Sequence, residues 1–264
     1  MYQVHRIGKW KKILEIELPS LLKHLKSMIK IGGLQKLTLI DYPGNLACTV
    51  FLSGCNFRCP FCYSAELVLP EKIARQPEIS QKYFFDFLKQ RKGQLDGVVI
   101  CGGEPTINPD LPNFCSQIKK MGYKVKLDTN GSNPFLLAKI LKNKLLDYVA
   151  MDIKAPQEKY AQMIGFDGCH TSYLLNKIQK SIDLLKNGAV DYEFRTTFVP
   201  GLHTKDDISA IVRWLKPAKR FYLQNFRPEK TLDPNLSTLR PYQADEMAGY
   251  LNLLTPFFET AQIR

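Results

Sequence analysis

The 264-residue sequence lacks any apolar run long enough to cross a membrane. Its basic N-terminus is not followed by the apolar core and small-residue cleavage site of a signal peptide. We therefore expect a cytoplasmic protein without a membrane partner, in which cysteines are thiols or metal ligands rather than disulfides. No internal repeat or low-complexity linker divides the chain, so one large domain is the economical interpretation.

Acidic residues are scarce, because 25 Asp and Glu stand against 37 Lys and Arg and give a net charge of +12. Such a balance suits nucleic acid, anionic cofactors or an acidic protein. An arginine-rich run or an aromatic-interleaved basic stripe is missing, so nucleic acid is not favoured. Residues 1–30 are the most basic part, and 20–29 has an amphipathic helical pattern. We predict a basic N-terminal extension over 1–30, accessory rather than membrane-binding, and the functional domain over 31–264.

Apolar β-rich segments alternate with segments of helical periodicity along the rest of the chain. The predicted strands are 47–53, 97–101, 123–129, 146–154, 190–201 and 220–226. The predicted helices are 83–91, 111–122, 133–143, 175–188, 205–216 and 242–258. This alternation indicates an α/β fold with a parallel sheet. In barrel-like folds of this kind the site lies at the carboxyl ends of the strands.

Three of the seven cysteines lie in the stretch CNFRCPFC, at Cys55, Cys59 and Cys62, directly after the first predicted strand. A zinc site normally needs a fourth ligand from a second CxxC or HxxxH pair, and the sequence contains neither. Three thiolates suit an iron–sulfur cluster with one iron that lacks a protein ligand. That iron is open to bind another molecule.

The CxxxCxxC spacing, with Phe61 before the last cysteine, resembles the signature of radical S-adenosylmethionine enzymes. The resemblance implies an incomplete (βα)6 barrel and a [4Fe–4S] cluster on Cys55, Cys59 and Cys62. It also implies that the open iron chelates S-adenosylmethionine, which is cleaved by one electron to a 5′-deoxyadenosyl radical. The cofactor carries this chemistry, and the protein orients and shields it.

Motifs at the ends of the next three strands strengthen the resemblance. GGEP (102–105) follows the second strand, and in the family this segment meets the methionine amino group; Glu104 either accepts from that ammonium or locks the loop. LDTNG (127–131) and MDIK (151–154) match segments that contact the ribose and the methionine carboxylate, with Lys154 as the carboxylate partner. The candidate cofactor contacts are Phe61, Tyr63, Gly102, Gly103, Glu104, Asp128, Thr129, Asn130, Asp152, Lys154 and Arg195.

The role of Arg195 and the residues that contact adenine are each left with alternatives. Arg195, on the fifth strand, meets a carboxylate of the cofactor or forms a structural ion pair with Glu193 or Asp191. The family histidine near the end of strand six is replaced by QNFRP, so adenine contact falls to the backbone around Phe61 and Tyr63 or to Phe226. His203 follows strand five, and we interpret it as a loop histidine.

Residues 32–67, with DYPG at 41–44, closely resemble the activating proteins of anaerobic ribonucleoside-triphosphate reductases. The resemblance implies hydrogen abstraction from a glycine Cα of a partner glycyl-radical enzyme, with flavodoxin or ferredoxin as electron donor. This reaction needs no side-chain acid or base, so we name no catalytic residue. One rival is a carboxy-deazaguanine synthase, although Ser64 stands where that enzyme has threonine. Another is a non-catalytic cluster protein that binds nucleic acid.

Overall fold

The computed structural model describes residues 29–166 and 170–264, and it contains one eight-stranded sheet. Neighbouring strands follow the order of the chain: β1 (Ile31–Thr38), β2 (Ala47–Leu52), β3 (Gly97–Gly102), β4 (Lys124–Thr129), β5 (Tyr148–Asp152), β6 (Asp191–Phe198), β7 (Ala218–Asn225) and β8 (Phe258–Ile263). β1 is antiparallel to β2, and all other neighbours are parallel. The amphipathic pattern and Cys169 fall outside the described residues, apart from the pattern's last residue, the buried Ile29.

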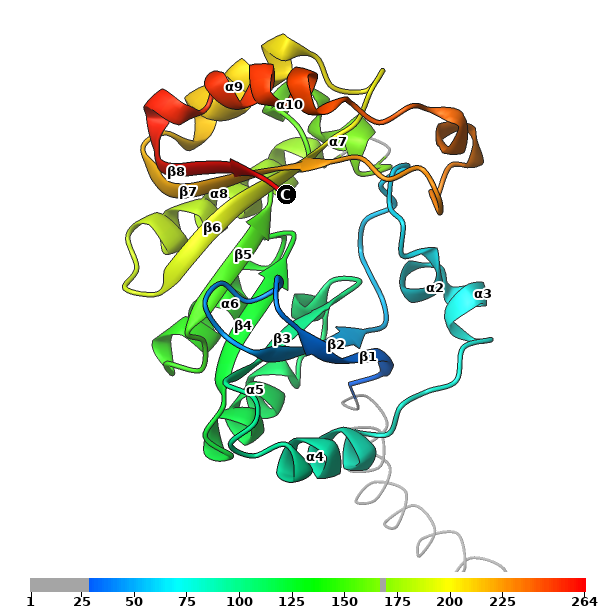
Figure 1. Cartoon of the computed structure of the whole chain (residues 1–264), viewed down its shortest axis with the longest axis vertical. Coiled ribbons are helices and arrows are strands. Elements are labelled where there is room, and N and C mark those ends of the chain that lie inside the picture. Colours follow the sequence, from blue (N-terminus) through cyan, green and yellow to red (C-terminus); the bar gives the residue numbers. More distant parts are fainter. Residues whose placement is uncertain (1–28, 167–169) are drawn as a thin grey trace, which may run out of the picture.

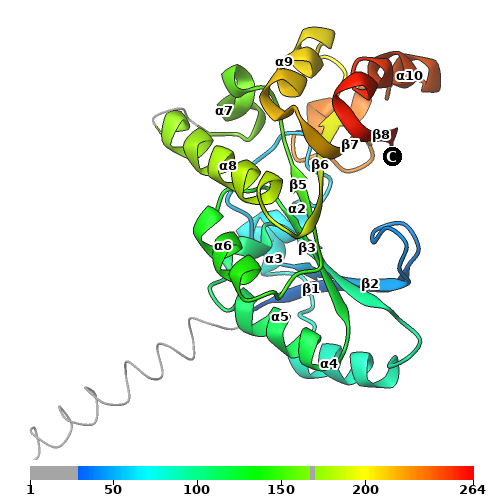
Figure 2. The same cartoon turned by 90° about the vertical axis from the view of Figure 1, so that its left-hand side faces the viewer.

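Helices connect the parallel strands and cover the outer face of the curved sheet (Figures 1 and 2). The longer ones are α4 (Gln81–Gln90), α5 (Leu111–Lys120), α6 (Pro134–Lys142), α8 (Thr171–Lys186), α9 (Lys205–Leu215) and α10 (Ala244–Asn252). Short helices are α2 (Ala65–Val68), α3 (Pro70–Ile73) and α7 (Tyr160–Met163). The starts of several are set by side-chain caps, since Ser80, Asn133 and Thr204 each accept a backbone N–H of the first turn.

The two faces of the sheet have opposite character because successive strand side chains point to opposite sides. On β4, Val125 and Leu127 belong to the main apolar core, together with residues from the helices. Their neighbours Lys126 and Asp128 are buried polar residues on the other, inner face. The helices therefore pack against the apolar outer face of the sheet, and the charged side chains lie on the inner face.

The six parallel strands predicted from the sequence are confirmed, but the sheet has two strands more. The sequence analysis missed β1 and β8, and it extended the last helix to residue 258 although α10 ends at Asn252. Pro256 lies in a 3₁₀ turn (Thr255–Phe257) that redirects the chain into β8. Within the described residues β1 and β8 are the edge strands and do not pair with each other, so the barrel is open between them.

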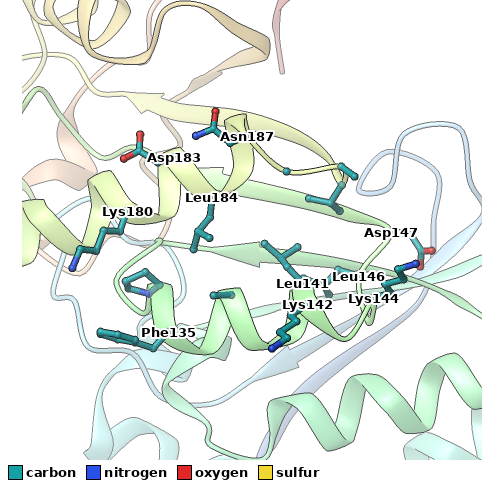
Figure 3. A pocket seen from close by; sticks show the side chains of 15 residues that line it. Phe135, Leu141, Lys142, Lys144, Leu146, Asp147, Lys180, Asp183, Leu184 and Asn187 are labelled. Atoms are coloured by element: carbon teal, nitrogen blue, oxygen red, sulfur yellow. The ribbon is translucent and has the colours of Figure 1, made fainter.

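A groove of about 990 Å³ lies on the outer face between α6 and α8 (Figure 3). Leu141, Leu146 and Leu184 line it, and Lys142 and Lys180 stand at its rim. It includes the turns that precede β5 and β6, so it lies at the opposite end of the strands from the cysteine loop. No described helix is long and apolar enough to cross a membrane.

Candidate active site

The three cysteines lie in the loop between β2 and α2, at the carboxyl end of β2. Arg58, inside the motif, donates through Nη1 to the carbonyls of Cys55 and Phe57 at 2.8 and 2.7 Å. Its backbone N–H donates to the carbonyl of Ile164 at 2.7 Å. Arg58 thus closes the loop on itself and ties it to the segment after α7.

The cysteine thiols are close enough to influence one another. The pKa of Cys55 is raised to about 11 and that of Cys59 to about 12, mainly by burial and in smaller part by negative charge on Cys62. A bound iron centre offsets these effects, because a metal ion stabilises the thiolate form of its ligands. No described group of three His, Cys, Asp or Glu residues is arranged for a single metal ion. The donor set of three thiols fits a [4Fe–4S] cluster.

The GGEP segment lies directly against the cysteine loop, with backbone touching backbone. The N–H of Gly103 donates to Leu52 O at 2.9 Å, and that of Glu104 donates to Gly54 O at 2.8 Å. A Cβ on Gly103 would stand 2.0 Å from Gly54 O and 3.2 Å from Cys55 Cβ. Glycine is required here because any side chain would push the cysteine loop away.

Glu104 locks this loop, the second of the two roles expected for it. It is 1% exposed, and it accepts from Thr129 Oγ1 at 2.7 Å and from the N–H of Asn130 at 2.6 Å. Thr106 donates its N–H to the same carboxylate at 3.0 Å. Burial raises the pKa of Glu104, while these donors oppose that rise. The carboxylate therefore fastens the ends of β3 and β4 together.

Asn56, which follows the first cysteine, joins the same assembly. Asn130 Nδ2 donates to Asn56 Oδ1 at 3.0 Å, and Asn56 Nδ2 donates to Ser132 Oγ at 2.9 Å. The N–H of Ser132 returns to Asn130 Oδ1 at 3.0 Å. Asn130 and Thr129, both predicted as cofactor contacts, are thus engaged in holding the cysteine loop. The sequence analysis did not identify Asn56 or Ser132.

An ion-pair network lines the inner face beside this loop. Arg195 donates through Nε to Asp152 at 2.8 Å and through Nη1 to Asp128 at 2.9 Å. Lys126 pairs with Asp128, and Lys154 pairs with Asp152 at 2.9 Å. Burial by itself raises the pKa of both carboxyls, but the neighbouring cations hold each pKa below its usual range. Asp128, Asp152, Lys154 and Arg195 are therefore brought together, as predicted for one site.

Of the two structural partners expected for Arg195, Glu193 lies at the distance limit of an ion pair, whereas Asp191 pairs elsewhere. Arg195 Nη1 is 4.0 Å from Glu193 Oε1, farther than from either aspartate. Glu193 is instead engaged by Arg264 at 2.7 and 3.2 Å and accepts from Tyr148 Oη at 2.7 Å. Asp191 pairs with Arg220 at 3.3 Å. Arg195 is bound by carboxylates from β4 and β5 because its long side chain extends across the inner face.

Lys154 has free capacity toward the cysteine loop. Its side chain is 17% exposed, and Nζ donates to Asp152. Burial lowers its pKa, but Asp152 and Cys59 together outweigh burial and raise it, so the side chain is an ammonium. An ammonium has three N–H donors, and a ligand carboxylate can accept from the donors that do not bind Asp152. The position suits the predicted contact with the methionine carboxylate.

His203 lies in the loop between β6 and α9, as expected, and the structure shows that it positions its neighbours. Its Nδ1 accepts the N–H of Val199 at 3.1 Å, so Nε2 carries the proton and donates to Lys154 O at 2.9 Å. The ring centroid lies 6.2 Å from that of Phe61, edge to face. Burial lowers the pKa of His203 to about 4. The neutral imidazole braces the backbone of Lys154 and the side chain before Cys62.

The aromatic candidates for adenine differ in exposure. Phe61 is buried at 4% exposure, whereas Tyr63 is 55% exposed beside the inner-face charges of Asp152 and Arg195. Phe226, at 2%, belongs to the apolar core and is not available for stacking. Adenine contact therefore remains a prediction for the backbone around Phe61 and Tyr63.

Residues 49–215 match the family model of the Radical SAM superfamily. The Methanocaldococcus jannaschii protein named "Putative glycyl-radical enzyme activating enzyme MJ1227" is 34% identical over 239 residues, covering 89% of this chain and 95% of that protein. A second protein of this kind from the same organism, MJ1632, is 26% identical over 202 residues, with 72% of both chains covered.

Among solved structures, a radical SAM methyltransferase from Sphaerobacter thermophilus gives a TM-score of 0.65 at 13% identity, covering 86% of this chain and 68% of that one. At this identity the likeness concerns the fold. The matched family region begins in β2 and contains Cys55, Cys59 and Cys62 together with the inner-face network. The chain belongs to the Radical SAM superfamily, and its cofactors are a [4Fe–4S] cluster and S-adenosylmethionine.

Proposed function

We propose that this protein activates a glycyl-radical enzyme by removing a hydrogen atom from the Cα of one glycine of that partner. The proposal is carried by the 34% identity to the protein named "Putative glycyl-radical enzyme activating enzyme MJ1227", which extends over 95% of that protein. The resemblance of residues 32–67 supports an anaerobic ribonucleoside-triphosphate reductase as the partner. The finer assignment rests on that segment alone.

The chemistry divides between cofactor and protein. When bound, the cluster would use one electron from flavodoxin or ferredoxin to cleave S-adenosylmethionine into methionine and a 5′-deoxyadenosyl radical. The partner's glycine would lose one hydrogen atom from its Cα to that radical and would keep the unpaired electron. No proton is transferred, so the absence of an unpaired acid or base among Asp128, Asp152 and Arg195 agrees with the reaction.

In this proposal each group of residues has one task. Cys55, Cys59 and Cys62 hold the cluster, and Lys154 binds the carboxylate of S-adenosylmethionine. The Arg195 network presents a surface whose charges already satisfy one another. A neutral main-chain segment can approach such a surface without leaving a charge unpaired. The open side between β1 and β8 admits that segment.

The test is low-temperature EPR. The reconstituted protein is incubated anaerobically with dithionite, S-adenosylmethionine and the purified anaerobic ribonucleotide reductase of its own organism. We expect a doublet radical signal on the partner, and its collapse when the glycine Cα carries deuterium. Cleavage of S-adenosylmethionine without any radical on the partner would reject the reductase as the substrate.

A further inference from the structure

The loop of residues 39–46, which joins β1 to β2, exposes large apolar side chains. Leu39 is 69% and Ile40 is 77% exposed, and Leu37, near the end of β1, is 54% exposed. Single exposed apolar residues are common on protein surfaces, but a cluster of them marks an interaction site. We refer to Leu37, Leu39 and Ile40 as the apolar patch.

The backbone beneath the apolar patch is firmly held, so its exposure is not the result of a loose loop. Thr38 Oγ1 accepts the N–H groups of Ile40 and Asp41 at 3.4 and 3.2 Å. Asp41 Oδ2 accepts from Thr49 Oγ1 at 2.8 Å. At the far end of the loop, the N–H of Leu46 donates to Asp96 at 2.8 Å. The fold therefore fixes these side chains in contact with water.

The same loop is continuous with the inner face of the sheet. Tyr42, two residues after Ile40, is 3% exposed, and its ring centroid is 6.0 Å from that of Tyr148. A Cβ on Gly97 would lie 2.9 Å from Tyr42 Cε1, so the ring rests directly on the start of β3. With Ala47, Val99 and Tyr148 it forms a small apolar cluster, and Cys101 packs against it.

The loop also lies on the open side of the molecule. In Figure 2 it stands opposite the outer helices α5, α6 and α8, on the same side as the end of β8. The two edge strands of the described sheet are β1 and β8. A chain segment that reaches the inner face between those edges passes beside the apolar patch.

The distance between the apolar patch and the cysteine loop decides what kind of ligand can contact both. The patch lies at the start of β2, and the cysteine loop begins at its other end. Six extended residues span roughly 20 Å. A small molecule cannot touch both places, whereas a protein that delivers a segment to the inner face can.

We propose that the apolar patch of Leu37, Leu39 and Ile40 docks the protein that carries the substrate glycine. The inference rests on the proposed function and adds a binding surface to it. The partner contributes an apolar surface of its own, and its glycine segment enters between β1 and β8. Docking at the patch holds the partner while that segment reaches the inner face.

The experiment compares three proteins with the same anaerobic ribonucleotide reductase: the wild type, Leu39→Ser combined with Ile40→Ser, and the control Phe135→Ser. Phe135 is 72% exposed on the outer helix α6, so the control removes an equally exposed apolar side chain from the opposite side. The rate of glycyl-radical formation is measured by EPR against partner concentration. Iron content and partner-free cleavage of S-adenosylmethionine are measured on each protein.

The double variant should need about tenfold or more partner for half-maximal rate. Its iron content and partner-free cleavage should equal those of the wild type, and Phe135→Ser should match the wild type throughout. An unchanged partner requirement in the double variant overturns the docking site. The docking site is also overturned if sedimentation shows that the only effect of the substitutions is to dissociate a dimer of this chain. A wild type that forms no radical on the reductase rejects the proposed partner instead.

Discussion

His203 donates a hydrogen bond from Nε2 to the main-chain carbonyl of Lys154, at 2.9 Å. The bond joins the turn after β6 to the end of β5, and the opposite ring nitrogen is occupied by the N–H of Val199. The contact with Val199 requires a neutral imidazole, because Nδ1 must accept. The geometry and the lowered pKa of about 4 therefore describe the same state.

Acid should weaken the fold through this histidine. In the unfolded chain its pKa is about 6.5, so between pH 6.5 and 4 the unfolded state takes up a proton that the folded state does not. The stabilising contribution is complete above pH 6.5 and is lost as the pH falls. Lowering the pH from 6.5 to 5 should cost about 1.5 kcal/mol of unfolding free energy through His203. Denaturant titrations of the cluster-loaded protein at both values measure it.

The control for this prediction is His203→Gln, whose side chain does not titrate. The variant is expected to be less stable at neutral pH, and its loss between pH 6.5 and 5 should be smaller than that of the wild type by the same amount. Equal losses in the two proteins would show that His203 titrates normally.

Replacement of any one of Cys55, Cys59 and Cys62 by Ala should abolish assembly of the cluster. We propose that each supplies one of the three thiolates that hold the cluster, because all three lie in the loop after β2. Cys48→Ala and Cys115→Ala serve as matched controls, because both thiols are fully buried in the apolar core. Iron and sulfide analysis after anaerobic reconstitution measures the outcome. A control that loses as much iron as the loop variants contradicts the three-ligand assignment.

Lys154→Ala should weaken binding of S-adenosylmethionine on the order of tenfold to a hundredfold. The variant removes a charge-assisted hydrogen bond from a largely buried site, and such bonds contribute roughly 1.5–3 kcal/mol. Iron content should be unchanged, because no cluster ligand is touched. Equilibrium binding to the reconstituted variant measures the effect, and Lys89→Ala, an exposed lysine of α4, is the control. Wild-type affinity in a fully loaded variant would exclude this role for Lys154.

Glu104→Gln should destabilise the fold by about 1–3 kcal/mol. The carboxylate accepts on both oxygens, from Thr106 and Thr129 on one and from Asn130 on the other. A carboxamide must direct its NH₂ group at one of these donors. Denaturant unfolding gives the loss, with Glu71→Gln on the exposed side of α3 as control. If the two variants are equally stable, Glu104 does not fasten β3 to β4.

The fold was predictable wherever one strong pattern decided the structure. The six strands from β2 to β7 are short apolar runs that alternate with amphipathic helices, and all six were predicted. The edge strands were missed because an edge is covered on one side only and needs little apolar sequence. β1 contains Gly32 and Gly33 and exposes Gln35 and Lys36. The end of α10 was predictable from Pro256, a signal that the helical periodicity obscured.

The residues of the candidate site were likewise predictable only where a local pattern marks them. The cysteines and the strand-end motifs were identified because each is a local signature. Asn56, Ser132 and His203 act through partners from distant parts of the chain, and no local pattern announces those contacts. Arg195 shows the limit most clearly: its own strand offered Glu193 and Asp191, but its shortest ion pairs are with Asp128 and Asp152 on the two strands before it.

Because the strands are arranged in the order of the chain, the parts of the cluster site are synthesised one after another. The ribosome completes the cysteine loop early, directly after β2, but the residues that brace it follow much later. Asn130 arrives with the end of β4, and His203 arrives only after β6. A nascent chain thus carries three thiols long before it has a cavity to shield them. We expect iron and sulfide to be delivered to the finished protein rather than during synthesis.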